Sequence, residues 1–412
     1  MRALVILAVV ATTAHATPRT PDDAVGDAMR ALVAGEYGAV AATYEPPSAP
    51  TAHEIEVTWR GKSAALGTVA SWAIVDRTYQ DGFATRMVDI AFARGHLVCL
   101  VTIAPDTNQL LSMFLAPPAP APRYIDRTRF RDEQIAIGKA PYELGATLSV
   151  PVGRGPFPAV VLVHGSGPND RDETVGSVKV FADLAAGLAS AGIAVLRYDK
   201  RTFTYGDKLG NSLLLDDEVV DDAVAAVRAV AARKDVSRVI VVGHSLGGLL
   251  APEIAVKARN VAGLVLLAPP GRAPWDIILD QMRYLHAPAS ELRALERAVT
   301  VIDIGGSADF LGMPFAYWQD MSRRDGVAMV KQLGKPALVL HGDRDYQVID
   351  ADIAVWRDGL AGTRLARFVT LPGDNHVLVT GTGLSHPLEY KRPAHVDARA
   401  VDAIVRFVTE TR

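Results

Sequence analysis

From residue 159 onward, apolar residues gather into five short runs, and segments with helical periodicity separate them. One such segment is Val180–Ala191, and another is Asp216–Arg233, which opens on Asp-Asp-Glu as favours a helix N-terminus. Runs that are apolar on both faces and alternate with helices indicate a parallel sheet covered on both sides. The pattern therefore predicts an α/β fold. The five predicted strands are Ala159–Val163, Ile193–Arg197, Arg238–Val242, Leu264–Ala268 and Ala337–Leu340.

Two further segments belong to this region. A hairpin is predicted over Phe130–Val150, with Gly145 near its turn. A long insertion, 271–333, separates the fourth and fifth runs and is rich in aromatic residues such as Tyr317 and Trp318. We interpret it as a mostly helical cap over the C-terminal edge of the sheet. Aromatic residues at such spacing more often form a core than a pocket, but a cap also packs against the cleft that a substrate enters.

The pattern before residue 116 is different. Val25, Met29 and Leu32 recur at helical spacing and predict an amphipathic first helix. Strand-like runs separated by turn residues follow, and they favour an antiparallel meander. Residues 22–115 are thus predicted to form a small α+β domain, which the Pro-rich linker 116–123 joins to a second domain, 124–412. The three runs are Arg86–Ala93, His96–Ile103 and Leu110–Leu115.

Length and composition agree with this division. A chain of 412 residues suggests two domains, and 49% hydrophobic with 22% charged residues is typical of a globular protein. The net charge of -3 and the lack of a basic run give no support for nucleic-acid binding. The single cysteine, Cys99, lies in an apolar run and is interpreted as a buried thiol without an internal disulfide.

The first residues have the pattern of a signal peptide. Arg2 gives a positive start, Ala3–Val10 an apolar stretch, and Ala14-His15-Ala16 a cleavage site of the small-x-small type. The apolar stretch is far shorter than the roughly 20 residues of a spanning helix. A merely apolar N-terminus is the alternative interpretation. We predict removal of residues 1–16, no integral membrane segment afterwards, and an exported protein that is periplasmic or extracellular.

The run Gly243-His244-Ser245-Leu246-Gly247 reads G-x-S-x-G. An apolar strand-like run precedes it, and an apolar helical stretch follows. A serine between two glycines in a strand-turn-helix setting is typical of a nucleophile elbow. The turn must be tight and strained to raise the hydroxyl above the sheet, and glycine alone leaves room for the backbone on both sides. A plain glycine-rich turn is the alternative.

A serine nucleophile needs a base and an acid that orients the base. Two aspartates follow the last strong strand; Asp345, in the spacing G-x-x-D, is favoured as the acid, and Asp343 is predicted to cap the turn. Three histidines come later. His376 follows a strand-like run on a loop, where a base must lie, whereas His386 and His395 fall in a Pro- and Gly-bearing stretch and fit solvated loop positions.

The first parallel strand ends in H-G-S-G-P, a turn that can aim a backbone N–H at the site. We predict that Ser166 and Leu246 supply the oxyanion hole through their amides. His244 and His341 are explained by packing and local hydrogen bonds. The charged runs 169–173 and 198–201 are interpreted as mutual ion pairs that hold the loops. No clustering at metal-ligand spacing and no dinucleotide motif is found, so no cofactor is predicted.

Together the motifs H-G-S-G-P-N-D-R-D-E, R-Y-D-K-R-T, G-H-S-L-G-G, G-D-R-D-Y-Q-V and D-N-H resemble a bacterial, exported, esterase-like branch of the α/β-hydrolase superfamily, near the serine aminopeptidase and dienelactone hydrolase groups. The resemblance implies an α/β-hydrolase fold with a mostly parallel sheet and a helical cap. It gives Ser245, Asp345 and His376 the roles of a catalytic triad, and Ser166 and Leu246 the oxyanion positions. Asp374-Asn375 departs from many relatives, which have a glycine or apolar residue before the histidine.

The resemblance implies hydrolysis of small-molecule carboxylic esters with short to medium acyl chains. A peptidase of the same fold and a non-catalytic binding protein on a hydrolase scaffold are the alternatives. Residues 22–115 resemble the NTF2-like class of small domains found ahead of some exported bacterial hydrolases. Natural substrate and oligomeric state do not follow from the sequence.

Overall fold

The computed structural model describes residues 20–80, 83–209, 213–303 and 314–411. The predicted signal peptide, 1–16, lies outside these residues. Of the described residues, 20–77 and 83–115 fall in the first of two compact units, and 78–80 and 116–411 fall in the second. Residues 117–122, in the predicted linker, form neither helix nor strand. Within the described ranges, no helix has the length and apolar character needed to cross a membrane.

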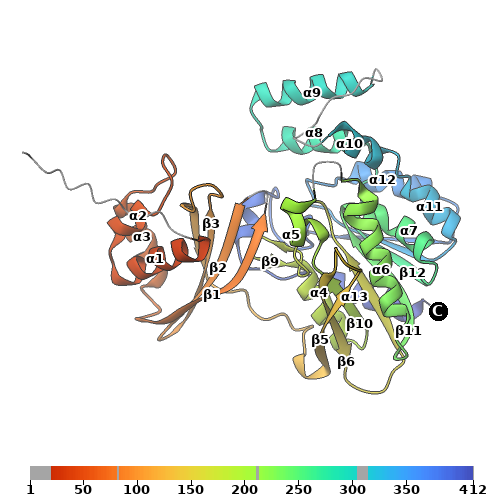
Figure 1. Cartoon of the computed structure of the whole chain (residues 1–412), viewed down its shortest axis with the longest axis horizontal. Coiled ribbons are helices and arrows are strands. Elements are labelled where there is room, and N and C mark those ends of the chain that lie inside the picture. Colours follow the sequence, from red (N-terminus) through yellow and green to blue (C-terminus); the bar gives the residue numbers. More distant parts are fainter. Residues whose placement is uncertain (1–19, 81–82, 210–212, 304–313, 412) are drawn as a thin grey trace, which may run out of the picture. The chain divides into compact units, whose positions relative to one another are not determined.

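The first unit combines helices with a four-stranded sheet in the order β1-β2-β3-β4 (Figure 1). Its first helix begins at Pro21, and Thr20 caps it by accepting a hydrogen bond from the Asp23 amide. Val25, Met29 and Leu32 are buried, as the helical spacing predicts. The likeness to the NTF2-like class stays a prediction. The elements are α1 (Pro21–Ala34), α2 (Tyr37–Ala42), α3 (Ala52–Ser63), β1 (Val69–Gln80), β2 (Phe83–Phe92), β3 (Gly95–Ile103) and β4 (Leu110–Ala116).

An eight-stranded sheet organises the second unit, in the order β14-β13-β12-β11-β7-β10-β6-β5. The six strands from β14 to β10 pair in parallel, and the β5–β6 hairpin joins the β10 edge antiparallel. All five predicted apolar runs are strands of this sheet. The strands are β5 (Phe130–Ile137), β6 (Leu144–Pro151), β7 (Phe157–Val163), β10 (Ala194–Tyr198), β11 (Val236–His244), β12 (Gly263–Leu267), β13 (Ala337–Gly342) and β14 (Ala366–Leu371).

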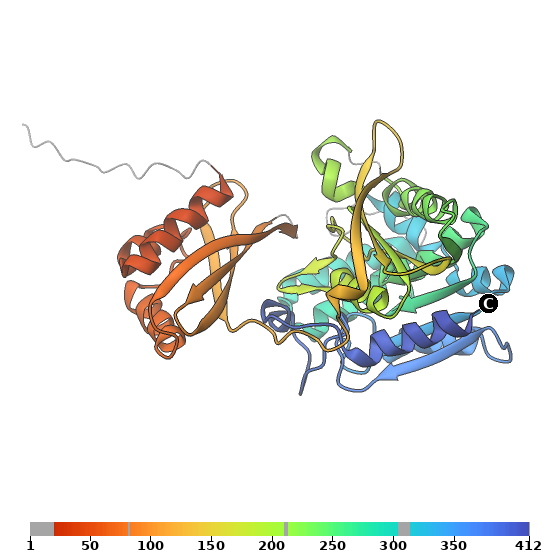
Figure 2. The ribbon, with the colours of Figure 1, turned by 90° about the horizontal axis from the view of Figure 1, so that it is seen from below.

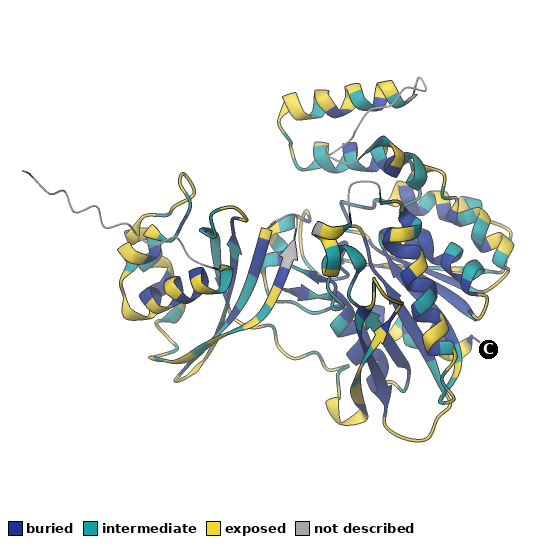
Figure 3. Cartoon of the chain, in the orientation of Figure 1, coloured by how far each residue is buried: buried dark blue, intermediate teal, exposed yellow. Residues whose placement is uncertain are grey.

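Helices cover both faces of the sheet, which explains why its strands are apolar on both sides (Figure 2). Alternate residues of β7 enter different cores: Val161 packs with α6 and α7, whereas Val160 packs with α4 and α13. Figure 3 shows buried strands under helices whose outer faces are exposed. The covering elements are α4 (Val180–Ser190), the π-helix η3 (Asp216–Val220), α6 (Asp221–Ala231), α7 (Leu246–Ala258), α12 (Asp350–Gly359) and α13 (Ala398–Glu410).

The predicted cap is helical in its described part, between β12 and β13. Tyr317 and Trp318 are buried and pack edge to face. Short elements fill the remaining loops of the second unit. The cap helices are α8 (Pro274–Tyr284), α9 (Ala289–Asp303), α10 (Phe315–Ser322) and α11 (Gly326–Leu333). The short elements are η1 (Arg127–Arg129), β8 (Thr174–Val175), β9 (Val178–Lys179), α5 (Arg201–Tyr205), η2 (Gly206–Lys208) and η4 (Pro387–Lys391).

One detail of the predicted hairpin is wrong. Gly145 lies inside β6 and not at the turn, where Gly138 adopts a positive φ of 80° instead. A Cβ at Gly145 would lie 2.4 Å from the Arg171 guanidinium and 3.0 Å from the Asp199 carboxylate. A larger residue at this position would have to displace the ion pair between Arg171 and Asp199.

Candidate active site

Ser245 occupies a strained turn between β11 and α7. Its backbone has φ 52° and ψ -119°, a conformation that a non-glycine residue adopts only where the surrounding structure enforces it. The Ser245 amide donates to the Leu267 carbonyl over 2.8 Å, and the Ser245 carbonyl accepts from Gly248 and Leu249 in the first turn of the helix. The strand-turn-helix setting predicted from the sequence is present.

Both glycines of the motif are required by close backbone contacts. A Cβ at Gly243 would lie 2.1 Å from the Gly247 carbonyl oxygen. A Cβ at Gly247 would lie 2.2 Å from the carbonyl oxygen of Val163 in β7. Real side chains do not tolerate such distances, so a larger residue at either position must displace backbone. The spacing G-x-S-x-G is therefore a packing requirement of this turn.

His376 and Asp345 meet on two loops beyond β14 and β13. The distance between His376 Nδ1 and Asp345 Oδ2 is 2.7 Å, and both side chains are buried. The other carboxylate oxygen of Asp345 accepts the amides of Gln347 and Val348, at 2.8 and 3.0 Å. These bonds fix the carboxylate toward the imidazole. Asp345 thus has the geometry of an acid that orients a histidine.

The alternative residues lie elsewhere. Asp343 accepts the Gly373 amide over 2.7 Å, so it binds the turn after β14, 30 residues further along the chain. His386 caps the short helix η4. His395 faces Asp183, 3.0 Å away, near the start of α13. Neither of these two histidines contacts Asp345 or Asp343.

A cavity of about 1090 Å³ opens above the turn, and Ser245, Ser166 and Leu246 all line it. The predicted nucleophile and both predicted oxyanion residues therefore face one space. The Ser245 hydroxyl forms no hydrogen bond with another described residue, His376 included. Across the same described ranges, no three His, Cys, Asp or Glu side chains gather closely enough to hold a metal ion.

The loop 164–168, here called the oxyanion loop after its predicted role, lies directly against Ser245. A Cβ at Gly165 would lie 3.2 Å from the Ser245 Cβ. The buried Lys200 ammonium donates to the carbonyl oxygens of Gly165 and Gly167, both over 2.9 Å, and pairs with Glu218 at 2.6 Å. Because a trans peptide group is planar, holding the Gly165 carbonyl toward Lys200 turns the Ser166 N–H the opposite way.

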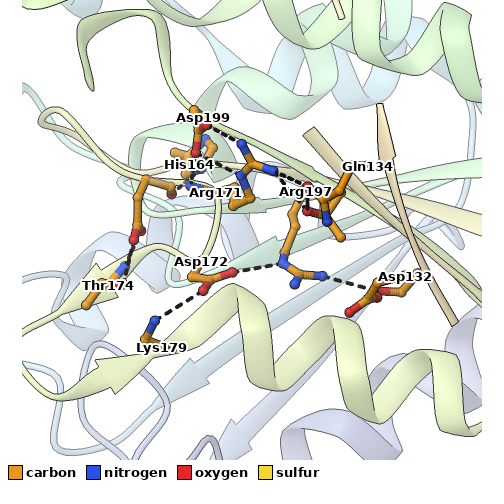
Figure 4. A network of polar contacts seen from close by, with 12 residues as sticks. Asp132, Gln134, His164, Arg171, Asp172, Thr174, Lys179, Arg197 and Asp199 are labelled. Carbon is orange, nitrogen blue, oxygen red and sulfur yellow. Dashed lines mark hydrogen bonds and ion pairs between the residues drawn. The ribbon is translucent and has the colours of Figure 1, made fainter. Parts of the chain in front are cut away.

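Ion pairs fix the charged segment that follows this loop, and these are the contacts shown in Figure 4. Arg171 binds Asp199 with an Nη2–Oδ2 distance of 2.6 Å, and its other contacts reach the β5–β6 hairpin. Asp172 binds Arg197 at 2.9 Å and Lys179 at 3.3 Å. The prediction that these runs form ion pairs is confirmed. Their partners, however, include residues of neighbouring strands as well as of the two runs themselves.

The sequence interpretation of His341 is confirmed, but that of His244 is wrong. His341 Nε2 donates to the Val348 carbonyl, only seven residues away, over 3.0 Å. His244 Nδ1 instead lies 3.1 Å from the carboxylate of Glu173, and its Nε2 lies 3.0 Å from the carbonyl oxygen of His376. These partners are distant in sequence, so no local pattern could have revealed them.

His244 and Glu173 form a buried ion pair. Burial opposes both charges, but the attraction between the two groups outweighs it, so the pKa of His244 is raised and that of Glu173 is lowered. The imidazole rings of His244 and His376 lie 4.8 Å apart, centre to centre. The residue before the nucleophile therefore contacts the loop that carries the predicted base.

Comparison with known proteins agrees with this geometry. A model of the alpha/beta hydrolase family matches residues 160–391, more than half of the chain. The chain belongs to the alpha/beta hydrolase family. The protein named Esterase EstD from Thermotoga maritima is 36% identical over 363 residues, which cover 85% of this chain and 86% of that protein. The predicted fold class is thus confirmed.

Solved structures of esterases are also similar to this chain. Est1E from Butyrivibrio proteoclasticus has a TM-score of 0.47 and 20% identity, over 68% of this chain and 98% of its own. An esterase from Pyrobaculum calidifontis has a TM-score of 0.45 and 22% identity, over 68% of this chain and 84% of its own.

Proposed function

We propose that this alpha/beta hydrolase is a serine hydrolase of carboxylic esters. The observation that carries the proposal is the 2.7 Å contact between the buried carboxylate of Asp345 and the imidazole of His376. The base loop, residues 372–380, is joined to the nucleophile turn through the bond between His244 and the His376 carbonyl. The similarity to Esterase EstD supports an ester as the substrate.

In the proposed reaction, the Ser245 hydroxyl attacks the acyl carbonyl carbon while His376 takes its proton. The amides of Ser166 and Leu246 stabilise the oxyanion, and Asp345 holds the imidazole in the tautomer that can accept at Nε2. His376 then protonates the departing alkoxide. Water, deprotonated by His376, attacks the acyl-enzyme, and the acid leaves as Ser245 regains its proton.

The cavity indicates an uncharged substrate with apolar groups. Leu249, Ile277 and Trp318 contribute apolar surface to its wall. Its volume of about 1090 Å³ lies at the upper end of small-molecule sites, which span roughly 300–1,000 Å³. Acyl chains of short to medium length fit this space together with a bulky alcohol.

The same wall argues against an aminopeptidase, which needs a carboxylate for the substrate amine. Among the described residues, two acidic ones line the cavity, and both form contacts within the protein. Glu218 pairs with the buried Lys200 at 2.6 Å. Asp325 accepts the Ala328 amide over 2.8 Å as the N-cap of α11. We therefore favour the ester over the peptide.

The test compares the native protein with Ser245→Ala on p-nitrophenyl esters from acetate to decanoate. We expect Ser245→Ala to lower kcat/KM by roughly 10⁶-fold, to below detection, with an unchanged fold. The native protein should hydrolyse acetate to octanoate esters and should form a covalent adduct at Ser245 with a fluorophosphonate probe. Full ester hydrolysis by Ser245→Ala would exclude this mechanism, and faster cleavage of aminoacyl-amides than of esters would favour the peptidase.

We further propose that the protein is exported. The proposal depends on the signal-like pattern of residues 1–16. Expression with the native N-terminus in a Gram-negative host, followed by N-terminal sequencing of the periplasmic and culture fractions, should give a mature protein that starts at Thr17. An unprocessed protein confined to the cytoplasm would contradict export.

A further inference from the structure

Glu173 is a buried carboxylate beneath the oxyanion loop, with only 2% of its surface exposed. Its Oε1 accepts the Gly165 amide over 2.7 Å, and its Oε2 lies 3.1 Å from His244 Nδ1. Gly165 immediately precedes Ser166, the predicted oxyanion donor. Glu173 thus fixes the backbone of the loop on the N–H side, while Lys200 fixes it on the carbonyl side.

The second partner of His244 lies in the base loop. His244 Nε2 is 3.0 Å from the carbonyl oxygen of His376, and the ring is buried. Carboxylate and carbonyl oxygens are both acceptors, so both ring nitrogens must carry a proton to satisfy them. A neutral imidazole has one N–H and would leave a lone pair against one of these oxygens. The approach of the Glu173 carboxylate to Nδ1, at 3.1 Å, and of the His376 carbonyl to Nε2, at 3.0 Å, therefore favours the imidazolium form of His244.

These contacts form one continuous buried chain. It runs from the Gly165 amide through Glu173 and His244 to the His376 carbonyl, and it joins the segment after β7, the end of β11 and the base loop. We propose that Glu173 and His244 are positioning residues, which set the oxyanion loop and the base loop at fixed distances from Ser245. The inference rests on the function proposed above, because it concerns the same reaction. Neither residue lines the cavity.

A role confined to stability is the competing explanation, since a buried ion pair is often replaceable without loss of activity. Positioning makes a different prediction, because misplacement of about 1 Å can lower kcat by about 100-fold while substrate binding is unchanged. The variants must therefore separate the hydrogen-bond geometry of Glu173 from its charge. Glu173 can be replaced by a neutral residue that is able to contact both Gly165 and His244.

The neutral replacement is Glu173→Gln. Its amide oxygen can accept the Gly165 N–H, and its NH₂ can donate to Nδ1 of a neutral His244, which keeps its Nε2–H for the His376 carbonyl. Glu173→Met has a similar length and removes the bond to Gly165. The double variant Glu173→Gln/His244→Leu keeps that bond and removes the one to the base loop, without leaving a buried charge.

Each variant is assayed on p-nitrophenyl butyrate, with thermal unfolding as the control for folding. We expect Glu173→Gln to keep kcat within about threefold of the native value. Glu173→Met and the double variant should each lower kcat by about 10- to 100-fold, with KM changed by less than about threefold. If Glu173→Met does not fold, the double variant alone is used to test the inference.

Two results would overturn the inference. One is native kcat in a folded Glu173→Met or double variant, and the other is a Glu173→Gln variant as impaired as these. Ser245→Ala serves as the reference for the proposed function. If Ser245→Ala is inactive and the Glu173 variants are unimpaired, positioning alone is wrong. If Ser245→Ala keeps full activity, the proposed mechanism itself fails.

Discussion

Asp374 offers a direct test of the electrostatics of the base loop, and we predict that Asp374→Asn stabilises the protein at neutral pH. The side chain has no exposed surface. Its Oδ1 accepts from the Thr380 hydroxyl over 2.8 Å and from Arg399 over 3.1 Å. Burial raises the pKa of Asp374 to about 6, and the nearby Asp397 carboxylate adds to the increase.

The sign and size of the effect follow from the two pKa values. The carboxyl binds a proton more tightly in the folded than in the unfolded state, so the contribution of Asp374 to stability is greatest below pH 3.8 and is lost as the pH rises through about 6. About two pKa units at 1.36 kcal/mol each give about 3 kcal/mol. Asn resembles the neutral acid and avoids this loss. Because its new NH₂ must also find an acceptor, such as Asp397, we expect a net gain of about 1–3 kcal/mol at pH 8.

The assay is urea unfolding, followed by tryptophan fluorescence and by loss of esterase activity, at several pH values between 4 and 8. At each pH, the free energy of unfolding of the native protein is subtracted from that of Asp374→Asn, because the titrations that both proteins share then cancel. This difference should rise between pH 4 and pH 7 by about 2–3 kcal/mol and reach a plateau above pH 7. Asp402→Asn, on the exposed side of α13, is the matched control and should give a constant difference. A constant difference for Asp374→Asn as well would refute the reasoning.

Two predictions concern residues near Ser245: one tests the packing of Gly247, and the other tests the ion pair between Lys200 and Glu218. Gly247→Ala brings a Cβ to 2.2 Å from the Val163 carbonyl and should lower the unfolding free energy by about 1–3 kcal/mol and remove activity, whereas Gly61→Ala, which meets nothing within 4 Å, should do neither. Equal stability of the two variants in urea would contradict this. Lys200→Met leaves the Glu218 carboxylate buried and unpaired and should cost about 3–5 kcal/mol. Adding Glu218→Gln should recover part of that loss; a double variant no more stable than the single one would speak against it.

Most of the sheet could be predicted from sequence because its strands are buried on both faces. Such strands are continuous apolar runs, and β7, β11 and β12 stand out for this reason. The first unit was harder. Its longest strand, β1, was missed, because its apolar run Trp72–Val75 is followed at once by the charged residues Asp76 and Arg77. The helices α2 and α3 were missed as well, and Trp59 is the single buried residue of α3.

The candidate site, like the fold, has a part that could be predicted from the sequence and a part that could not. Asp345 and His376 follow strands, so their position relative to the sheet edge could be inferred from order and spacing. The role of Glu173 could not. It ends a polar run in which Arg171 and Asp172 form ion pairs, and its partner, His244, lies 71 positions later at the variable position of the serine motif. Only the fold brings the two together.

The course of the chain through the cap has a practical consequence. The chain leaves the sheet at the end of β12 and returns at β13, and these two strands are immediate neighbours, paired from Leu264 with Ala337 to Leu267 with Leu340. Because the two strands are parallel, the connection leaves the sheet at the C-terminal edge and must return to the N-terminal edge before β13 begins. A protein engineer who exchanges cap helices to reshape the walls around a substrate must therefore keep this return path, so that Ser245 and its partners stay on an unchanged sheet.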